Sequence, residues 1–334
     1  MNIDLDKLFA DFSKMKVGVI GDVMLDTYWW GNVERISPEA PVPVVAVHRR
    51  EKRIGGAGNV ALNIEQLGAS VAVLTLLGDD EEGVVLKDLL KEKNIDTRYV
   101  LESKKRITTN KIRIISRNQQ MLRLDAEQTS YIENADEEKL LNLVEKFITA
   151  EHPDVIIFED YNKGILTEKI IESTIALCNQ YNITTTVDPK RKNFFSYRNV
   201  SLFKPNLNEV VAALNLLPEE LSEDLLGDIH ENLKAQLQHN ISLITLSDKG
   251  IFYQENKIKK IIPSHLRNIS DVSGAGDTVI AVASLVYAQT KNIELAASIA
   301  NIAGGIVCEE VGTVPISKEK LFYETKKLLN EIPV

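Results

Sequence analysis

The chain has 334 residues, of which 44% are hydrophobic and 26% are charged, an ordinary composition for a globular protein with a buried core. This composition therefore excludes a fibrous protein or a disordered tail. The 39 Lys and Arg residues against 48 Asp and Glu residues give a net charge of −9, which offers no broad attraction to nucleic acid or to an anionic membrane. The length suits one large α/β domain, with or without a small appendage.

Cysteine content and the N-terminal segment indicate the compartment. Cys178 and Cys308 are too few for a disulfide framework or a four-thiolate zinc site. The segment MNIDLDKLFADF lacks the basic region and apolar run of a signal peptide, and the longest apolar stretch, 279–288, is shorter than a membrane span. We therefore expect a cytoplasmic protein without a membrane partner.

Short apolar runs alternate along the chain with segments of helical periodicity. The predicted buried strands are 16–21, 71–77, 154–158, 183–187, 200–203 and 242–246. The predicted helices are 57–67, 81–93, 136–150, 167–180 and 223–239, followed by 275–288, 295–304 and 318–330. This alternation predicts an α/β fold, a doubly wound and mostly parallel sheet flanked by helices.

Two stretches break that rhythm. Segments 41–48 and 108–125 alternate apolar with polar residues, which is typical of antiparallel strands with one solvated face. No repeat, low-complexity tract or linker interrupts the sequence. We predict a single domain over 1–334, with a small projecting β-sheet lid formed by about 28–50 and 106–125. The lid would cover a site, pair two subunits or do both, and a merely decorative hairpin is the alternative.

The segment DVSGAGDT at 271–278 directly precedes an apolar helical pattern. The small residues Gly274, Ala275 and Gly276 would let backbone N–H groups crowd an anion at a helix N-terminus. A carboxylate at Asp277 would repel a bound phosphate, so it suits a base that takes a proton from an attacking hydroxyl. The segment predicts phosphoryl transfer, and an ordinary glycine-rich helix cap is the alternative.

A second glycine-rich segment, GGAGN at 55–59, also opens a helical pattern. Residues 56–61, GAGNVA, match the dinucleotide-binding pattern GxGxxA, and Asp79 and Asp80 follow about 20 residues further on, so a nicotinamide-dependent oxidoreductase is an alternative. That pattern needs a buried strand running into its first glycine, whereas the basic run 48–53 intervenes here. The Walker pattern GxxxxGK[ST] is absent from the sequence, so a nucleotide-triphosphate enzyme would use another phosphate cradle.

Five segments, in this order and spacing, resemble the ribokinase-like (PfkB) sugar kinases over nearly the whole chain. They are GDVMLD at 21–26, GGAGN at 55–59, KPNLNE at 204–209, TLSDKG at 245–250 and DVSGAGDT at 271–278. Further strings resemble the kinases of bacterial ADP-heptose synthesis: RISPEAPVPV at 35–44, SRNQQ at 116–120, LRLD at 122–125, DYNKG at 160–164 and DPK at 188–190.

This resemblance implies an ATP-dependent kinase that phosphorylates D-glycero-β-D-manno-heptose 7-phosphate at O1, for ADP-heptose and lipopolysaccharide core synthesis. Another sugar or sugar phosphate as acceptor, and a non-catalytic sugar-binding protein, are the alternatives. Two-domain relatives continue into a nucleotidyltransferase with an HxGH-type signature, which this sequence does not contain. We expect either a separate kinase or part of a bifunctional protein.

The resemblance also implies roles on the nucleotide side. Asp277 is the implied base, and the N–H groups of Gly274, Ala275 and Gly276 form the implied anion hole. The implied ATP-binding residues are Asn206, Leu207, Asn208, Glu209, Thr245, Ser247, Gly250 and Asn301. Glu209 would hold Mg²⁺ through water. A loop that varies within the family would bind K⁺ through Asp271, Ser273 and Gly312.

On the sugar side the implied binding residues are Asp26, Gly55, Gly56, Asn59 and Asp160. The 7-phosphate needs a cationic anchor, because arginine and lysine are the side chains that hold phosphate groups. The candidate anchors are Arg117, Arg123, Lys163 and Lys190. The resemblance further implies a homodimer formed through the lid.

Overall fold

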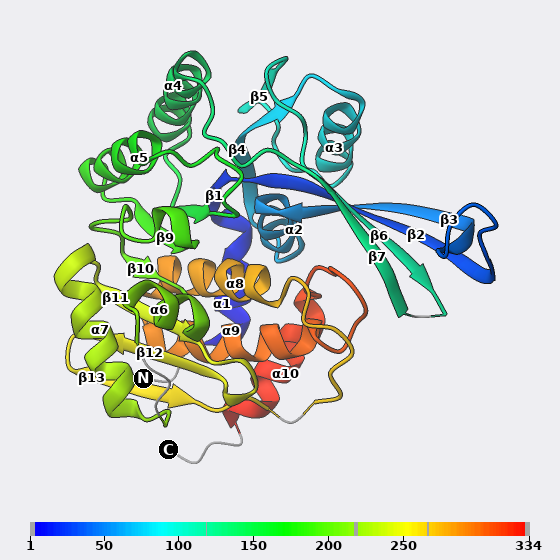
Figure 1. Ribbon diagram of the computed structural model, residues 1–334. Coiled ribbons are helices and arrows are strands. Elements are labelled where there is room, and N and C mark those ends of the chain that lie inside the picture. The colour runs from blue at the N-terminus through cyan, green and yellow to red at the C-terminus, as the bar shows by residue number, and fades with distance from the viewer. Residues whose placement is uncertain (1–3, 118, 217–219, 266, 331–334) are drawn as a thin grey trace.

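The body of the molecule is a nine-stranded sheet covered by helices on both faces (Figure 1). The computed structural model describes residues 4–117, 119–216, 220–265 and 267–330. The sheet order is β13-β12-β11-β10-β9-β8-β1-β4-β5, parallel throughout from β5 to β11 and antiparallel from β11 to β13. Its strands are β1 (Lys16–Gly21), β4 (Ser70–Gly78), β5 (Val100–Ser103), β8 (Val155–Glu159), β9 (Thr184–Asp188), β10 (Leu202–Phe203), β11 (Ile241–Thr245), β12 (Ile251–Glu255) and β13 (Ile258–Ile262).

Two apolar cores lie on opposite faces of this sheet. Along β8, Val155 and Ile157 join the core that includes α8, whereas Ile156 and Phe158 join the core under α4 and α5. Burial on both faces explains why the strands are continuous apolar runs. The helices are α1 (Leu5–Asp11), α2 (Ala57–Gln66), α3 (Glu81–Glu92), α4 (Asn134–Glu151), α5 (Glu168–Gln180), α6 (Leu207–Leu214), α7 (Glu223–Leu237), α8 (Ala275–Thr290), α9 (Ile293–Val307) and α10 (Lys318–Asn330).

The predicted α/β architecture is confirmed. Every strand and helix predicted for the body is present, with its ends shifted by three residues or fewer. The sequence analysis missed α1, β5, α6, β12 and β13, which are short or lie at the sheet's edges. No helix among the described residues has the length and apolar content needed to cross a bilayer.

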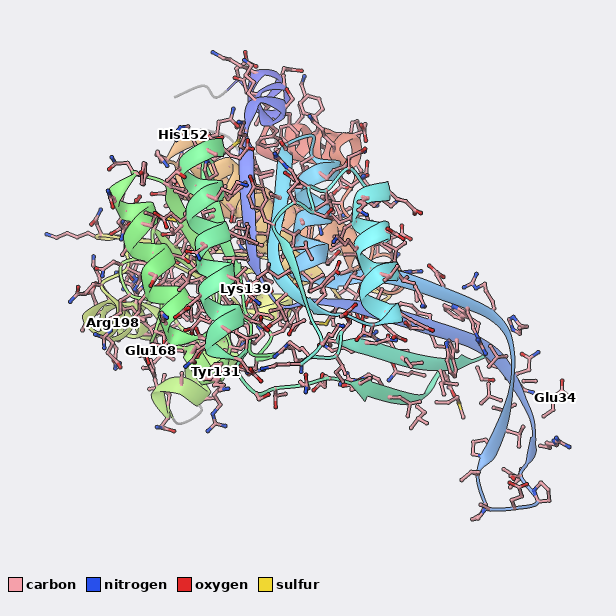
Figure 2. The ribbon with its side chains drawn as sticks, turned by 90° about the horizontal axis from the view of Figure 1, so that it is seen from above. Glu34, Tyr131, Lys139, His152, Glu168 and Arg198 are labelled. Carbon is pink, nitrogen blue, oxygen red and sulfur yellow. The ribbon has the colours of Figure 1, made fainter. Side chains whose placement is uncertain are left out.

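A second sheet of four strands projects from the body (Figures 1 and 2), and we call it the projecting sheet. Its order is β3-β2-β6-β7, with strands β2 (Val23–Ile36), β3 (Pro43–Gly56), β6 (Asn110–Ser116) and β7 (Gln119–Ala126). Figure 2 shows the β2–β3 hairpin reaching furthest from the body, with Glu34 near its far end. The predicted alternating strands belong to this sheet. It is larger than expected, because β2 begins almost directly after β1 and pairs in parallel with β6.

Strand register places charged side chains on one face of the projecting sheet. Side chains of register partners point to the same face, and side chains two residues apart along a strand do so as well. The first row on this face is Arg53, Asp26, Lys111 and Asp125, and the second row is Glu51, Tyr28, Arg113 and Arg123. We call this the inner face, because its side chains contact the body of the molecule, as described below.

Candidate active site

Asp277 lies in the first turn of α8 and is buried. Its Oδ2 accepts a hydrogen bond of 2.7 Å from Asn59 Nδ2, and its Oδ1 accepts one of 2.7 Å from the Tyr161 hydroxyl. Burial, together with the charge of Asp188, raises the pKa of Asp277 to about 6, although the two hydrogen bonds oppose this. Asp277 is thus oriented, ionised at neutral pH and a stronger base than an ordinary aspartate.

The N-terminus of α8 faces a polar cradle. Gly274 caps the helix with a left-handed φ of +78°, a conformation that favours glycine. A Cβ on Gly274 would lie 3.0 Å from Asn59 Nδ2, the group that holds Asp277. A Cβ on Gly276 would lie 3.6 Å from Asp188 Oδ2 and 3.9 Å from Lys204 Nζ. Backbone N–H groups and a buried lysine therefore meet beside Asp277, as the binding of a phosphoryl group requires.

Two lysines join the acids behind this cradle. Asp188 accepts from Lys190 Nζ at 3.0 Å and pairs with Lys204 Nζ at 2.8 Å. Burial opposes ionisation of Asp188, yet the two lysines hold its pKa below the ordinary value. Glu159, at the end of β8, is fully buried, and neither of its carboxylate oxygens has a hydrogen-bond partner among the described residues. Burial and the charges of Asp188 and Asp277 raise the pKa of Glu159 well above its usual value.

The predicted nucleotide residues gather at the ends of β10 and β11. Asn206 and Glu209 cap α6 reciprocally, each side chain accepting a 2.8 Å bond from the other's backbone N–H. Lys190 Nζ donates to Glu209 Oε1 at 2.7 Å, which joins this cap to Asp188. Thr245 forms a parallel bridge with Asn206. The first turn of α6 contains Leu207 and Asn208.

Other predicted nucleotide residues shape the adjoining loops. Ser247 and Gly250 both have positive φ, and a Cβ on Gly250 would lie 2.0 Å from the Ile262 carbonyl oxygen, so this position requires glycine. Asn301 is buried, and its Nδ2 donates a 2.8 Å hydrogen bond to the Pro263 carbonyl oxygen. Its amide therefore holds the segment that follows β13.

The described residues fit a magnesium nucleotide. Glu209 and Asp188 supply carboxylate oxygens, the donor type that Mg²⁺ prefers, and Lys190 bridges them. The side-chain-free backbone at Gly274 and Gly276 suits phosphate oxygens. No cluster of three or more Asp, Glu, His or Cys side chains arranged for a metal occurs within the described ranges.

The sugar-side residues meet where β2 and β3 leave the body. Asp26 is buried and forms an ion pair with Arg113 of β6. A Cβ on Gly55 would lie 2.3 Å from Asp26 Oδ2, and one on Gly56, whose φ is +59°, would lie 2.4 Å from the Asp22 carbonyl oxygen. Both positions require glycine for close approach. Sequence reasoning missed Arg113, because it appeared only as a polar residue in an alternating strand.

The candidate phosphate anchors are mostly engaged by acids. Lys163 Nζ pairs with Glu127 at 2.7 Å, and Arg123 holds Asp125 through bonds of 2.9 and 2.7 Å. Lys190 lies between Asp188 and Glu209, and its Nζ is also 5.6 Å from the centre of the Tyr161 ring. Arg117 is exposed and left-handed, with φ of +49°, just beyond β6.

Lys111, which the sequence analysis did not single out, differs from these candidates because no acid in the described part of the chain engages it closely. Its Nζ is 5.1 Å from the centre of the Tyr161 ring, whose hydroxyl donates to Asp277. Among the described residues no carboxylate lies within 4.0 Å of that ammonium. Burial of this half-buried side chain lowers its pKa, although the charge of Asp26 opposes the shift. This ammonium, which forms no close ion pair among the described residues, thus lies one tyrosine ring away from Asp277.

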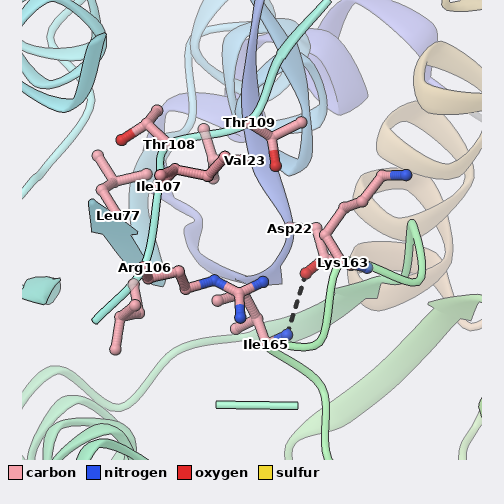
Figure 3. A pocket seen from close by; sticks show the side chains of 10 residues that line it. Asp22, Val23, Leu77, Arg106, Ile107, Thr108, Thr109, Lys163 and Ile165 are labelled. Carbon is pink, nitrogen blue, oxygen red and sulfur yellow. Dashed lines mark hydrogen bonds between the residues drawn. The ribbon is translucent and has the colours of Figure 1, made fainter. Parts of the chain in front are cut away.

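Tyr161 is presented by a loop that two buried acids organise. Asp22 accepts the backbone N–H groups of Tyr161, Lys163 and Ile165 at 2.9, 2.9 and 3.1 Å, and the bond to Ile165 is drawn in Figure 3. Asp160 accepts from Asn162 N–H, Asn193 Nδ2 and the Tyr197 hydroxyl. The carboxylate of Asp160, expected at the sugar, is therefore occupied by partners within the loop region.

A small pocket lies beside this loop (Figure 3). Its lining includes Asp22, Arg106, Thr109 and Lys163, and it has room for about one water molecule. The guanidinium of Arg106 donates to the carbonyl oxygens of Ser130 and Gln128. The pocket is too small for a sugar. Its lining residues hold the loop that presents Tyr161.

The three residues expected at a K⁺ ion form one cluster beside Gly274. Asp271 Oδ1 accepts from Ser273 N and Oγ at 3.0 and 2.8 Å, and its Oδ2 accepts from Gly312 N at 2.9 Å. Burial of Asp271 opposes ionisation, but these hydrogen bonds hold its pKa below the ordinary value. The cluster fixes the loop that precedes the α8 N-terminus.

The fold and the site together define a phosphotransferase that acts on a sugar hydroxyl. The chain belongs to the pfkB family of carbohydrate kinases, whose profile matches residues 14–320. The resemblance seen in the sequence is thereby confirmed, and the oxidoreductase alternative is set aside.

Curated relatives are similar over most of this chain. The bifunctional protein HldE of Geotalea uraniireducens is 39% identical over 325 residues, covering 96% of this chain and 65% of its own length. The protein of that name from Haemophilus influenzae is 39% identical over 317 residues, covering 93% and 64%. The chain therefore spans just under two thirds of the length of these relatives.

Solved structures share the fold at low sequence identity. Phosphofructokinase-2 from Escherichia coli in complex with potassium has a TM-score of 0.77 and 17% identity, covering 93% of this chain and 99% of the other. Ribokinase from Arabidopsis thaliana complexed with ribose and ATP has a TM-score of 0.72 and 15% identity, covering 92% and 98%. These likenesses confirm a ribokinase-like fold.

Proposed function

We propose that this protein is an ATP-dependent kinase that phosphorylates D-glycero-β-D-manno-heptose 7-phosphate at O1. It would act in the cytoplasm as a single kinase domain over 1–334, for ADP-heptose and lipopolysaccharide core synthesis. The similarity to proteins named HldE and the resemblance to kinases of ADP-heptose synthesis support this acceptor. A PfkB kinase for another sugar phosphate is the alternative.

Asp277 performs the proton transfer in this proposal. It accepts the proton of the attacking sugar hydroxyl while the new O–P bond forms and the bond to ADP breaks. The N–H groups of Gly274, Ala275 and Gly276, with Lys204, stabilise the charge on the transferring phosphoryl. Asn59 and Tyr161 hold the carboxylate in position for the hydroxyl.

The nucleotide and metal would lie on the other side of the cradle. Asn206, Glu209 and Lys190 would face the triphosphate, with Glu209 holding Mg²⁺ through water. The metal neutralises charge on the phosphate oxygens when bound. Asp271, Ser273 and Gly312 are the proposed K⁺ loop, and their mutual hydrogen bonds place them beside Gly274.

The position of Lys111 is the observation that best supports a phosphorylated acceptor. It shares the first row of the inner face with Asp26, the proposed ligand of the sugar hydroxyls. Its ammonium is half-buried and has no carboxylate within 4.0 Å among the described residues, although Asp26 lies in the same row, and a dianionic phosphate would supply a close counter-charge. A sugar that spans from Asp277 to Lys111 would pass along the Tyr161 ring.

Replacing Lys111 by methionine tests this assignment. The loss of one charge-assisted contact should raise KM for heptose 7-phosphate by about 10- to 100-fold, leave KM for ATP within about twofold and leave use of unphosphorylated heptose unchanged. Lys52→Met is the matched control, because Lys52 is exposed and belongs to the row of Thr27 on the opposite face. Steady-state kinetics, with the product position read by phosphorus NMR, gives these values. Equal efficiency on fructose 6-phosphate would overturn the heptose assignment but not the kinase.

A further inference from the structure

Arg53 connects the projecting sheet to the body beside the anion hole. From β3 its Nη1 donates to the carbonyl oxygens of Val311 and Thr313, at 3.4 and 3.2 Å. Its Nε donates to Glu51 at 2.6 Å, and its guanidinium carbon lies 4.9 Å from the centre of the Tyr28 ring. One side chain is therefore held by two neighbours on its own sheet while it binds the loop 311–313.

That loop lies against the start of α8. The Gly312 N–H donates to Asp271, which also binds Ser273, directly before the helix cap. A Cβ on Gly274 would lie 3.1 Å from the Thr313 side chain. Since Gly274 opens the anion hole, movement of 311–313 would displace the N–H groups that receive the phosphoryl.

The other end of this connection reaches the acceptor site. The Tyr28 ring that contacts Arg53 also lies 5.3 Å from the guanidinium of Arg113, and Arg113 forms the ion pair with Asp26. Arg53 and Asp26 are themselves register partners across β3 and β2. A continuous series of contacts therefore joins Asp26, the proposed ligand of the sugar hydroxyls, to the loop 311–313, which lies against the anion hole.

We propose that Arg53 is a positioning residue that couples seating of the projecting sheet on the acceptor to the geometry of the anion hole. The inference rests on the proposed kinase function, but it holds for any acceptor bound at Asp26. With the acceptor bound, Arg53 fixes 311–313 and thereby the N–H groups at Gly274–Gly276. Without a bound acceptor, the N–H groups of the anion hole are not held in the geometry that phosphoryl transfer needs. Bound ATP is therefore protected from attack by water until the acceptor arrives.

Arg53→Ala tests this coupling, with Arg49→Ala as the matched control. Arg49 lies on the same strand and face, is 3.7 Å from Glu51 and stacks 4.6 Å from the Trp30 ring, yet its described contacts do not include 311–313. Arg53→Ala should lower kcat about 10- to 100-fold, change both KM values less than about threefold and raise the ratio of ATP hydrolysed to sugar phosphorylated. Arg49→Ala should keep all of these values.

A second variant approaches the same contact from the other side. A Cβ at Gly312 would lie 2.8 Å from Arg53 Nη1, so Gly312→Ala should displace the guanidinium and reproduce the lower kcat and the uncoupling. Hydrogen exchange adds a readout other than turnover, because acceptor binding should protect the amides of 311–313 and 274–276 in the wild type but not in Arg53→Ala.

Three outcomes separate the hypotheses. A raised acceptor KM with unchanged kcat would make Arg53 a substrate-binding residue and overturn the coupling. The same kinetics in the Arg53→Ala and Arg49→Ala variants would also overturn it. Absence of phosphorylation of any sugar by the wild type would instead contradict the proposed function, while the hydrogen-exchange comparison with bound ATP and free sugars would still test the contact.

Discussion

At the residue scale, Asp277 makes a specific prediction for the pH dependence of turnover. Its pKa is raised to about 6, and only the ionised form accepts a proton, so kcat/KM should fall about tenfold per pH unit below about pH 6. Asp277→Asn should retain ATP binding, lower kcat by about 10²- to 10⁴-fold and abolish this acidic limb. Stopped assays between pH 4.5 and 8, with ATP binding by calorimetry, measure both. Turnover in the variant equal to that of the wild type would remove Asp277 from the mechanism.

Tyr161 provides a graded version of the same experiment. Its hydroxyl donates to Asp277 and lowers the pKa of that carboxylate. Tyr161→Phe should therefore move the acidic limb to higher pH while keeping measurable turnover. If the acidic limb of the Tyr161→Phe profile lay at the same pH as in the wild type, Asp277 would not be the group that titrates.

The sequence predicted some site residues and missed others for physical reasons. Asp277 was recognisable because a carboxylate within a glycine-rich helix start would repel a bound phosphate and therefore suits a base. Tyr161, Lys111 and Arg113 carried no such signal, since their roles depend on which strands are neighbours. Parallel pairing of β2 with β6 brings Arg113 to Asp26, and alternation within the segment does not reveal that pairing.

At the element scale, the outer face of the projecting sheet predicts a partner. Leu122 and Leu124 on β7 expose 52% and 44% of their surface, and they lie in register with Ile114 and Ile112. A single small sheet cannot bury such a face, so a second copy of this chain is the expected cover.

Leu122→Asp with Leu124→Asp should convert a homodimer into a monomer, because each charge would be buried without a partner at the interface. Val84→Asp is the control, since Val84 is 61% exposed on α3, outside the projecting sheet. Sedimentation velocity over micromolar concentrations measures the assembly. A monomeric wild type at all working concentrations would contradict the proposed dimer.

The same sheet shows how far element prediction reaches. Period-two alternation predicted strands at 41–48 and 108–125, which the structure confirms within β3, β6 and β7. The start of β2 was missed, because Val23–Tyr28 is buried and does not alternate. α6 was not among the predicted helices, because its eight residues give little periodicity, although the spacing of Asn206 and Glu209 is also typical of a helix N-cap.

At the scale of the whole molecule, protonation of some buried groups raises the free energy of unfolding, and protonation of others lowers it. Asp160 and Asp277, both with pKa raised to about 6, bind protons in the folded state before they do in the unfolded chain, so they stabilise the fold as pH falls from about 6 toward 3.8. His230 of α7 and His239, which lies between α7 and β11 in the sequence, are buried and act in the opposite direction. The two carboxylates and the two histidines therefore change the free energy of unfolding in opposite directions between pH 6.5 and 4.

The histidine contribution can be isolated by substitution. His230 Nδ1 and His239 Nε2 both bond the Ser242 hydroxyl, at 2.8 and 2.7 Å, and burial lowers their pKa values to about 4 and about 3. The unfolded histidines bind protons first, so the stability is complete above pH 6.5 and is lost as pH falls through the interval toward pH 4.

His230→Asn with His239→Gln keeps a polar atom at each bonded position but removes the titrating rings. Between pH 6.5 and 5, each histidine should cost the wild type about 2 kcal/mol of unfolding free energy, a loss that the double variant escapes. Because Asp160 and Asp277 are unchanged, the variant should instead gain stability over this interval relative to its own value at pH 6.5. Urea unfolding at both pH values measures the difference. Parallel pH profiles for the two proteins would show that the histidines are protonated in the fold, contrary to their burial.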